Sequence, residues 1–267
     1  MRSFSAQYLE ETRRGLWTES RDALSGLSLA DRHCILEVGC GTGVLTRVLA
    51  EETPTTTTVI AADRDRTHLT AASAYGEPLV ADALHLPLDD GSVDLTVCQA
   101  LLVNLASPED AVAEFARVST NLVAAIEPDN ANVTIESTVD DEAHTAAQAR
   151  EAFFAGAHSD PTLGSRVDTL FDHVGLERVK TTRYAFTQTI APPYDESTLA
   201  AARRHLSGAG LDADRETLLA GGLSVSEYDA LRTRWRLIGR KVAEQMQAGT
   251  YRRRETVPLY VTVGAVA

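Results

Sequence analysis

Residues 34–43 read CILEVGCGTG, an apolar run that passes directly into three closely spaced glycines. Ile35, Leu36 and Val38 supply the continuous apolar character that is typical of a parallel strand buried on both faces. The glycines allow a tight turn and a close approach of the backbone to a ligand, because no Cβ lies in the way. The segment therefore predicts a buried strand, a nucleotide-type binding turn and a helix that begins at Val44.

Strand-like and helical segments alternate on the C-terminal side of this turn. Further strands are expected at 59–62, 79–81, 93–98 and 122–126, and helices at 44–52, between Asp65 and Gly76, and at 108–119. Repeated strand–helix units of this length predict an α/β fold with a parallel sheet and helices on both faces. Right-handed crossovers would gather the carboxyl ends of the strands along one edge of that sheet.

The second half of the chain has a different pattern. Residues 142–175 and 196–249 are expected to be mostly helical, and strands are expected at 179–190 and from Val257 onward. The helical block between the last two strands predicts a cap. We expect a single domain over 1–267, with an N-terminal helical lid at 1–30, a Rossmann-like core at 31–190, the cap at 191–250 and a final strand at 251–267.

Composition limits the classes of partner. The chain has 267 residues and a net charge of −13, with 38 acidic against 25 basic residues, and such a surface repels phosphate backbones. Nucleic acid is therefore not expected as the main partner, and neither is a membrane, because no apolar run reaches the roughly 18 residues of a spanning helix. The N-terminus has no apolar signal core, so a cytoplasmic location is expected. The acidity also suggests adaptation to a salty cytoplasm.

Two classes of ligand compete for the glycine turn. A dinucleotide usually requires Gly-x-Gly-x-x-Gly, whereas this turn is Gly-x-Gly-x-Gly with Val44 at the sixth position. Glu37, two residues before the first glycine, would repel a pyrophosphate and would suit a ligand with an ammonium group and a nearby sulfonium. Asp63 is expected at the end of the next strand, where a carboxylate accepts hydrogen bonds from ribose hydroxyls. Asp82 ends the third strand and is placed to accept from the amino group of an adenine.

These motifs together resemble the class I S-adenosylmethionine-dependent methyltransferases of the small-molecule, UbiE-like type. The resemblance rests on EVGCGTG at 37–43, Asp63, DALHLP at 82–87 and SVDL at 92–95, and it covers about residues 34 to 128. It implies a Rossmann-like, seven-stranded sheet whose last strand is antiparallel. It also implies S-adenosyl-L-methionine as the cofactor.

The resemblance further implies a set of cofactor-binding residues. In chain order they are Glu37, Gly39, Cys40, Gly41, Asp63, Arg64, Asp82, Ala83 and Gln99. Glu37 and the first two glycines would hold the methionine part, Asp63 the ribose, and Asp82 with Ala83 the adenine. Asp63 or Asp82 alone could be an ordinary turn or cap residue, but their joint placement with the glycine turn favours cofactor binding.

The sequence argues against several classes of methyl-group acceptor. The segment after the fourth strand reads QALL at 99–102. It does not resemble the Asp/Asn-Pro-Pro-Tyr motif of enzymes that methylate adenine or amide nitrogens. Cys98 follows Val97 and not proline, which argues against cytosine carbon methylation. The only lysines are Lys180 and Lys241, so a Lys-Asp-Lys-Glu ribose-methylating arrangement is not expected. A small-molecule substrate remains.

Several residues are candidates near this substrate. Tyr8, Trp17 and Asn104 are expected near the carboxyl edge, although the two aromatic residues could instead anchor the N-terminal helices to the core. Glu127 is a candidate general base if it is buried, and the alternative is that it caps a turn with Pro128. No metal site is predicted, and the oligomeric state is left open.

Two features leave alternatives open. Arg232, Arg236 and Arg240 stand four residues apart on an expected helix and could meet an acidic substrate, but such stripes are usually solvated and ion-paired.

The motifs alone also fit a non-catalytic S-adenosylmethionine-binding or regulatory protein. An NAD-dependent oxidoreductase is disfavoured by Glu37 and by the missing glycine at position 44.

Overall fold

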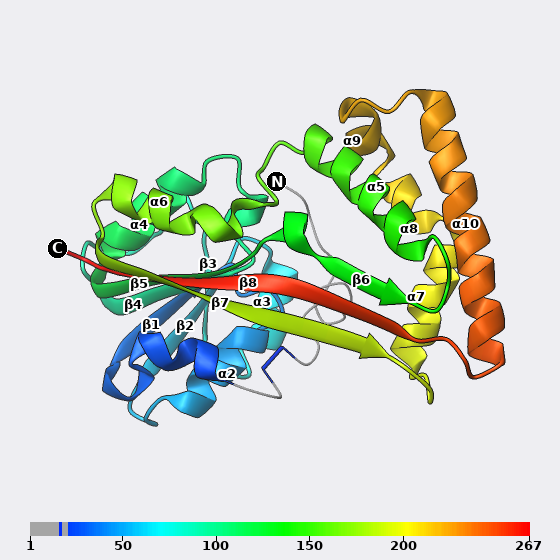
Figure 1. Cartoon of the computed structure of the whole chain (residues 1–267). Helices are drawn as coiled ribbons and strands as arrows, with labels where there is room; N and C mark the ends of the chain where they lie inside the picture. Colours follow the sequence, from blue (N-terminus) through cyan, green and yellow to red (C-terminus); the bar gives the residue numbers. More distant parts are fainter. Residues whose placement is uncertain (1–15, 18–20) are drawn as a thin grey trace. The chain divides into compact units, whose positions relative to one another are not determined.

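The computed structural model describes residues 16–17 and 21–267, which form two compact units (Figure 1). The first unit contains the described residues up to Asn130 together with Thr162–Tyr184 and Pro258–Ala267. The second unit contains Ala131–Pro161 and Ala185–Val257. Each unit is described by itself below.

A parallel sheet forms the first unit. Its strands are β1 (Cys34–Val38), β2 (Thr58–Asp63), β3 (Glu77–Val80), β4 (Val93–Gln99) and β5 (Ser119–Pro128), in the order β3-β2-β1-β4-β5. The C-terminal part of β8 (Arg253–Ala265) is antiparallel to β5, with Leu122 opposite Ala265 and Pro128 opposite Leu259. This arrangement confirms the predicted Rossmann-like α/β sheet with an antiparallel last strand.

Helices connect these strands as the sequence pattern predicts. They are α2 (Val44–Glu52), α3 (Arg66–Ala72), α4 (Pro108–Val118) and α6 (Val167–Val174), with short 3-10 turns η1 (Asp22–Leu27), η2 (Leu29–Asp31), η3 (Leu102–Asn104) and η5 (Leu163–Arg166). Asp65 caps α3, because its Oδ1 accepts a hydrogen bond from the Thr67 backbone N–H at 2.9 Å. Pro108 begins α4, where its missing donor costs nothing.

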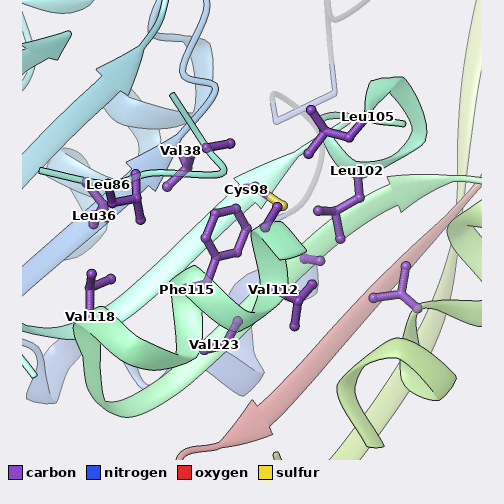
Figure 2. Close-up of a cluster of buried hydrophobic side chains, with 14 of the residues drawn as sticks. Leu36, Val38, Leu86, Cys98, Leu102, Leu105, Val112, Phe115, Val118 and Val123 are labelled. Carbon is purple, nitrogen blue, oxygen red and sulfur yellow. The ribbon is translucent and has the colours of Figure 1, made fainter. Parts of the chain in front are cut away.

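Each face of the sheet is covered by its own apolar cluster. Figure 2 shows the cluster on one face, where Phe115 of α4 lies among Leu36, Cys98 and Val123. On the other face Ile35 packs with residues of α2 and η1, among them Leu45 and Leu27. Neighbouring residues of β1 fall into different clusters because side chains alternate across a strand. Fully burying a side chain such as that of Phe115 stabilises the fold by about 1.5–3 kcal/mol.

The second unit is mainly helical. It contains α5 (Glu142–Gly156), α7 (Glu196–Ser207), α8 (Ala209–Ala213), α9 (Arg215–Ala220) and α10 (Val225–Gln247), together with β6 (Thr134–Ser137) and the last two residues of η4 (Asn130–Asn132). The end of β7 (Glu177–Ile190) and the start of β8 also belong to it, and β6 is antiparallel to β8 with Thr134 opposite Thr256. Ser224 and Glu227 form the capping box of α10.

The outcome for the predicted segments is mixed. Helices α7–α10 lie between β7 and β8, where the sequence predicts the cap, but the second unit also includes residues 131–161. Strand β6 makes eight strands in the described sheet and not seven. This strand is only four residues long, too short for an alternating pattern to identify it. The single-domain organisation stays a prediction.

The predicted N-terminal lid is only partly covered by the described residues. Most of the expected N-terminal lid, including Tyr8, lies outside the described residues. Among the residues that the structure describes, no helix has the length and apolar character needed to cross a membrane.

Candidate functional site

The glycine turn joins β1 to α2 in the first unit. The backbone N–H groups of Gly39 and Cys40 donate to the carbonyl oxygen of Ala62 at 2.8 and 3.0 Å, which ties the turn to β2. Gly39 has φ +73°, and a Cβ there would lie 2.9 Å from Leu101 Cδ1. Gly43 has φ +81°, and a Cβ there would lie 2.7 Å from Ala72 Cα. Gly43 therefore requires glycine for conformation and for space, whereas Gly39 requires it mainly for its positive φ, because the Leu101 side chain could shift.

Thr42 is a residue of this turn that the sequence analysis did not single out. Its side chain is buried, and its Oγ1 has no hydrogen-bond partner among the described residues. An unsatisfied buried hydroxyl costs about 1–3 kcal/mol, so a natural structure usually supplies a partner. The orphan hydroxyl within a cradle of glycines fits a ligand that contacts the turn. No sequence signal distinguishes this threonine from an ordinary turn residue.

Glu37 lies at the end of β1 with only 1% of its surface exposed. The Thr46 hydroxyl of α2 donates to Glu37 Oε2 at 2.5 Å. A buried carboxylate attracts a cationic group and repels a phosphate far more strongly than an exposed one, because water screens it less. The position therefore suits an ammonium group, as the sequence predicts, and does not suit a pyrophosphate.

Asp63 links the ends of β1 and β2. Its Oδ2 accepts from the Gly41 N–H at 2.9 Å, and its Oδ1 accepts from the Asp65 N–H at 2.8 Å. A carboxylate can accept about four hydrogen bonds, so two bonds leave capacity for the hydroxyls of a ribose. Arg64, the next residue, is exposed. The structure thus brings Asp63 and the glycine turn together, as the prediction requires.

The predicted adenine residues follow β3. Asp82 is exposed and its Oδ1 accepts from the Leu84 N–H at 3.0 Å, while its carbonyl oxygen accepts from the His85 N–H at 3.0 Å. Ala83 is buried. These bonds form a tight turn at the end of the strand, which is the geometry of an Asx turn. The turn holds Asp82 at the carboxyl edge of the sheet, two residues after Val80, which lies opposite Asp63 on β2.

Gln99 and Trp17 contact each other directly. The indole Nε1 of Trp17 donates to Gln99 Oε1 at 3.3 Å, and both side chains are buried. Trp17 also belongs to the apolar cluster that contains Leu27 and Leu45. This packing supports the interpretation that Trp17 anchors the N-terminal segment to the core. The indole then positions the Gln99 amide at the end of β4.

Glu127 is fully buried at the end of β5. Its Oε1 accepts from the N–H groups of Leu101 and Leu102, both at 2.9 Å, and its Oε2 accepts from the Val103 N–H at 3.3 Å. Burial raises the pKa of this carboxyl, while the three backbone donors act in the opposite direction. The geometry supports a turn-capping role, although the turn is the one that follows β4 and not the one at Pro128.

Asn104 lies in that same turn. Its Nδ2 donates to the carbonyl oxygen of Ala100 at 2.9 Å, and its side chain is half-buried. Ala100 itself has φ +49°, a left-handed conformation that a non-glycine residue adopts only where the surroundings hold it. Asn104 and Glu127 therefore both stabilise the loop that follows β4, at the carboxyl edge of the sheet.

The arginine stripe of α10 belongs to the second unit. Arg232 forms two hydrogen bonds to Asp212, at 2.6 and 2.8 Å, and Arg236 Nε donates to the carbonyl oxygen of Leu206 at 3.4 Å. This supports the ion-paired interpretation for Arg232, whereas the bond of Arg236 is to the backbone. Within the described ranges, no group of three or more metal-ligating side chains comes together.

Comparisons with known proteins agree with this geometry. Residues 36–121 match the model of a family described as a methyltransferase domain. No curated protein matches the chain. The family match confirms the predicted recognition of a methyltransferase, and the matched segment contains the glycine turn, Asp63, Asp82 and Gln99.

Solved structures share the fold at low sequence identity. A Bacillus halodurans protein provisionally assigned as a methyltransferase is 14% identical with a TM-score of 0.51, over 92% of this chain and 98% of that chain. The YcgJ protein of Bacillus subtilis is 13% identical with a TM-score of 0.50, over 92% and 98%. The provisional methyltransferase in a Haloferax volcanii complex with the Trm112 activator is 17% identical with a TM-score of 0.51, over 98% and 93%. These likenesses establish the fold.

Proposed function

We propose that this chain, whose residues 36–121 match the model of a methyltransferase domain, transfers the methyl group of S-adenosyl-L-methionine to a small-molecule acceptor. The observation that carries the proposal is the hydrogen bond from the Gly41 N–H to Asp63 Oδ2 at 2.9 Å. It joins the glycine turn to a ribose-accepting carboxylate, while Glu37 lies buried at the start of the same turn. Glu37 would thus face the amino-acid part of the ligand, and Asp63 would face its ribose.

Each part of the site has a role in binding. The Glu37 carboxylate would attract the ammonium group of the methionine part, and Thr42 Oγ1 would gain a hydrogen-bond partner. Asp63 would accept from the ribose hydroxyls, and Asp82 from the amino group of the adenine, with Ala83 against the ring. Cys40, Arg64 and Gln99 complete the proposed cofactor set. The cofactor supplies an electrophilic methyl group on a sulfonium.

The remaining residues would act by position. Methyl transfer needs a nucleophile held in line at close range, and orientation with exclusion of water can supply much of the acceleration. Glu127, whose two oxygens accept backbone hydrogen bonds, would hold the loop at 101–103 in place and would not need to take a proton. Trp17 and Asn104 would position the same edge of the site.

A small-molecule acceptor is supported by the sequence after β4. Residues 99–102 read QALL, which lacks the motifs of base methylation, and the net charge of −13 disfavours nucleic acid. A cytoplasmic location remains part of the proposal.

Binding is tested by calorimetric titration of the full chain with S-adenosylhomocysteine and, separately, with NAD. We expect S-adenosylhomocysteine to bind at one site, and NAD not to bind. Asp63→Ala should weaken binding about 10- to 100-fold, since it removes charge-assisted hydrogen bonds. Asp89→Ala, an exposed carboxylate in a nearby loop, is the matched control and should bind as the wild type does. Binding of NAD alone would overturn the proposal.

Turnover separates an enzyme from a non-catalytic binder. Incubation of the chain with S-adenosylmethionine and a panel of small hydroxyl, amine and carbon acceptors should produce S-adenosylhomocysteine with at least one of them. Tight binding of the cofactor without turnover on any acceptor would favour the binding or regulatory alternative.

A further inference from the structure

His68 is a buried histidine that lies beside the proposed cofactor set without belonging to it. It is in the first turn of α3, and its side chain is only 10% exposed. Its Nδ1 is 3.8 Å from Oδ1 of Asp63, whose side chain is 12% exposed. Asp63 is the carboxylate that would accept hydrogen bonds from the ribose hydroxyls, so a change at His68 acts directly on the proposed ribose site.

The protonation state of His68 decides how this pair interacts. A distance of 3.8 Å is too long for a hydrogen bond, which spans about 2.7–3.2 Å. An imidazolium carries an N–H on both ring nitrogens, so the protonated form can donate from Nδ1 whichever tautomer the neutral form has. Little water screens the two side chains, and opposite charges at this separation attract each other strongly. Protonation therefore favours a hydrogen bond from Nδ1 to Asp63 Oδ1.

The acceptor capacity of Asp63 is limited. A carboxylate has about four lone-pair sites. The backbone N–H groups of Gly41 and Asp65 occupy two of them, at 2.9 and 2.8 Å. Two ribose hydroxyls would fill the other two. A hydrogen bond from protonated His68 takes one of the sites that the ribose needs, so the histidine and the ribose compete for the same carboxylate.

Several charged groups surround His68. Asp63 faces it from β2, and Asp65 caps its own helix. Hydrogen bonds from Thr67 lower the pKa of Asp65, and the charges of His68 and Arg64 act in the same direction. Helix α2 and strand β3 also pack against α3, and their charged residues are Arg47, Glu51, Glu52 and Glu77. A single substitution at His68 leaves all these groups in place and isolates the contribution of the imidazole.

We infer, on the premise of the proposed function, that His68 makes cofactor binding depend on pH, because its protonated form pairs with Asp63 and competes with the ribose hydroxyls. Histidine is the side chain whose charge ordinarily changes between pH 5 and 8. The complex forms with the neutral imidazole, so binding at acid pH expels a proton. The affinity then falls by up to about tenfold for each pH unit over which the free protein is protonated at His68.

The first test is calorimetric titration of the full chain with S-adenosylhomocysteine at pH 8.0 and pH 5.5. We expect the wild type to bind at least about fivefold more weakly at pH 5.5. In His68→Gln, whose amide does not titrate, the loss should be less than about half as large. Equal losses in the wild type and a folded His68→Gln protein would overturn the inference.

His33→Gln is the matched control. His33 Nδ1 also lies near an aspartate, 3.7 Å from Asp94 Oδ2, but its side chain is 92% exposed. It precedes β1 at the end of the strand opposite the glycine turn. This variant should keep the pH dependence of the wild type. Loss of the dependence in His33→Gln would contradict the assignment to His68.

Proton release provides a second readout, which needs no variant. Titrations of the wild type in two buffers of different ionisation enthalpy count the protons that binding expels. We expect release of a large fraction of one proton at pH 6.0 and almost none at pH 8.0. Binding without proton release at pH 6.0 would overturn the role of His68 and leave the proposed function intact. Absence of binding at pH 8.0 would instead overturn the proposed function, and the role of His68 with it.

Discussion

A buried carboxylate can act as a general base or as a structural hydrogen-bond acceptor that caps a turn, and its hydrogen-bond partners distinguish the two roles. Glu127 has its oxygens directed at the N–H groups of Leu101, Leu102 and Val103, which a helix-like turn otherwise leaves without partners. Cys98 lies beside it, with Sγ 3.6 Å from Oε1, and burial raises the pKa of that thiol well above its usual range. These contacts support the interpretation that Glu127 caps the loop after β4, and its role stays a prediction.

Glu127→Gln should mainly cost stability. The amide keeps one acceptor oxygen but places an NH₂ group toward a backbone N–H, so the free energy of unfolding should fall by about 1–3 kcal/mol. Urea unfolding measures this, and Glu136→Gln, at an exposed position, should change it by less than about 0.5 kcal/mol. A loss of turnover of about 100-fold or more at unchanged stability would show instead that Glu127 is a general base.

His205 predicts a dependence of stability on pH. Burial and the positive charge of Arg253 lower its pKa to about 4 in the folded chain, against 6.5 for an ordinary histidine, so below pH 6.5 the unfolded chain takes up the proton first. The stability present above pH 6.5 should therefore be lost as the pH falls toward 4, by up to about 3 kcal/mol. Groups near it that also titrate or carry charge are Glu142, Tyr251 and Arg253.

The measurement compares urea unfolding of the wild type and His205→Phe between pH 7 and pH 4.5. The wild type should lose more stability than the variant over this range, since the other titrating groups are common to both. Equal losses in the two proteins would contradict the assigned pKa.

The elements around the glycine turn depend on close backbone approach. Gly43 brings the start of α2 against α3, where Ala72 Cα would lie 2.7 Å from an added Cβ. A side-chain rotation could not relieve the clash of an added Cβ at Gly43, because the atom that it would meet belongs to the backbone of α3. The close spacing of α2 and α3 therefore depends on the absence of a Cβ at Gly43. The same spacing shapes the turn that the proposed cofactor would contact.

Gly43→Ala should therefore destabilise the protein more than its conformation alone explains. We expect a loss of about 2–4 kcal/mol, the sum of a left-handed residue and a backbone clash. Gly175→Ala is the matched control: it also has positive φ, +86°, but nothing lies within 4 Å of its added Cβ, so about 1–2 kcal/mol is expected. Denaturant midpoints give both values. Equal losses would mean that α3 can move away.

For the molecule as a whole, charge is the dominant property. A net charge of −13 on 267 residues repels itself in the compact state, apart from local pairs such as Arg21 with Glu51 and Glu52. Salt screens such repulsion over about 10 Å at 0.1 M and about 3 Å at 1 M.

Thermal stability should consequently rise with salt. The unfolding midpoint at pH 7.5 should increase steadily between about 0.05 M and 1 M KCl, as the Debye length shortens. The increase should be much smaller near pH 5.0, the isoelectric point, where the net repulsion vanishes. A midpoint that is already maximal in low salt would argue against adaptation to a salty cytoplasm.

Sequence alone was sufficient for the first unit, because its signals are local. The apolar run of β1, the glycines after it and the cap of α3 each lie within a few residues, and the alternation of strands with helices restricts the topology. The helical block before the last strand was predictable for the same reason. Only the tertiary structure determined the partners of Glu127, Trp17 and His205.

Those partners lie 24 to 82 residues away along the chain, beyond any periodic pattern. Only folding leaves Thr42 Oγ1 and His205 Nε2 buried among described residues that offer them no hydrogen bond. The division into two units also comes from packing, since residues 131–161 join a helical unit built mostly from residues 185–257. Local preferences select the elements, and burial at long range decides which side chains are left to meet a ligand.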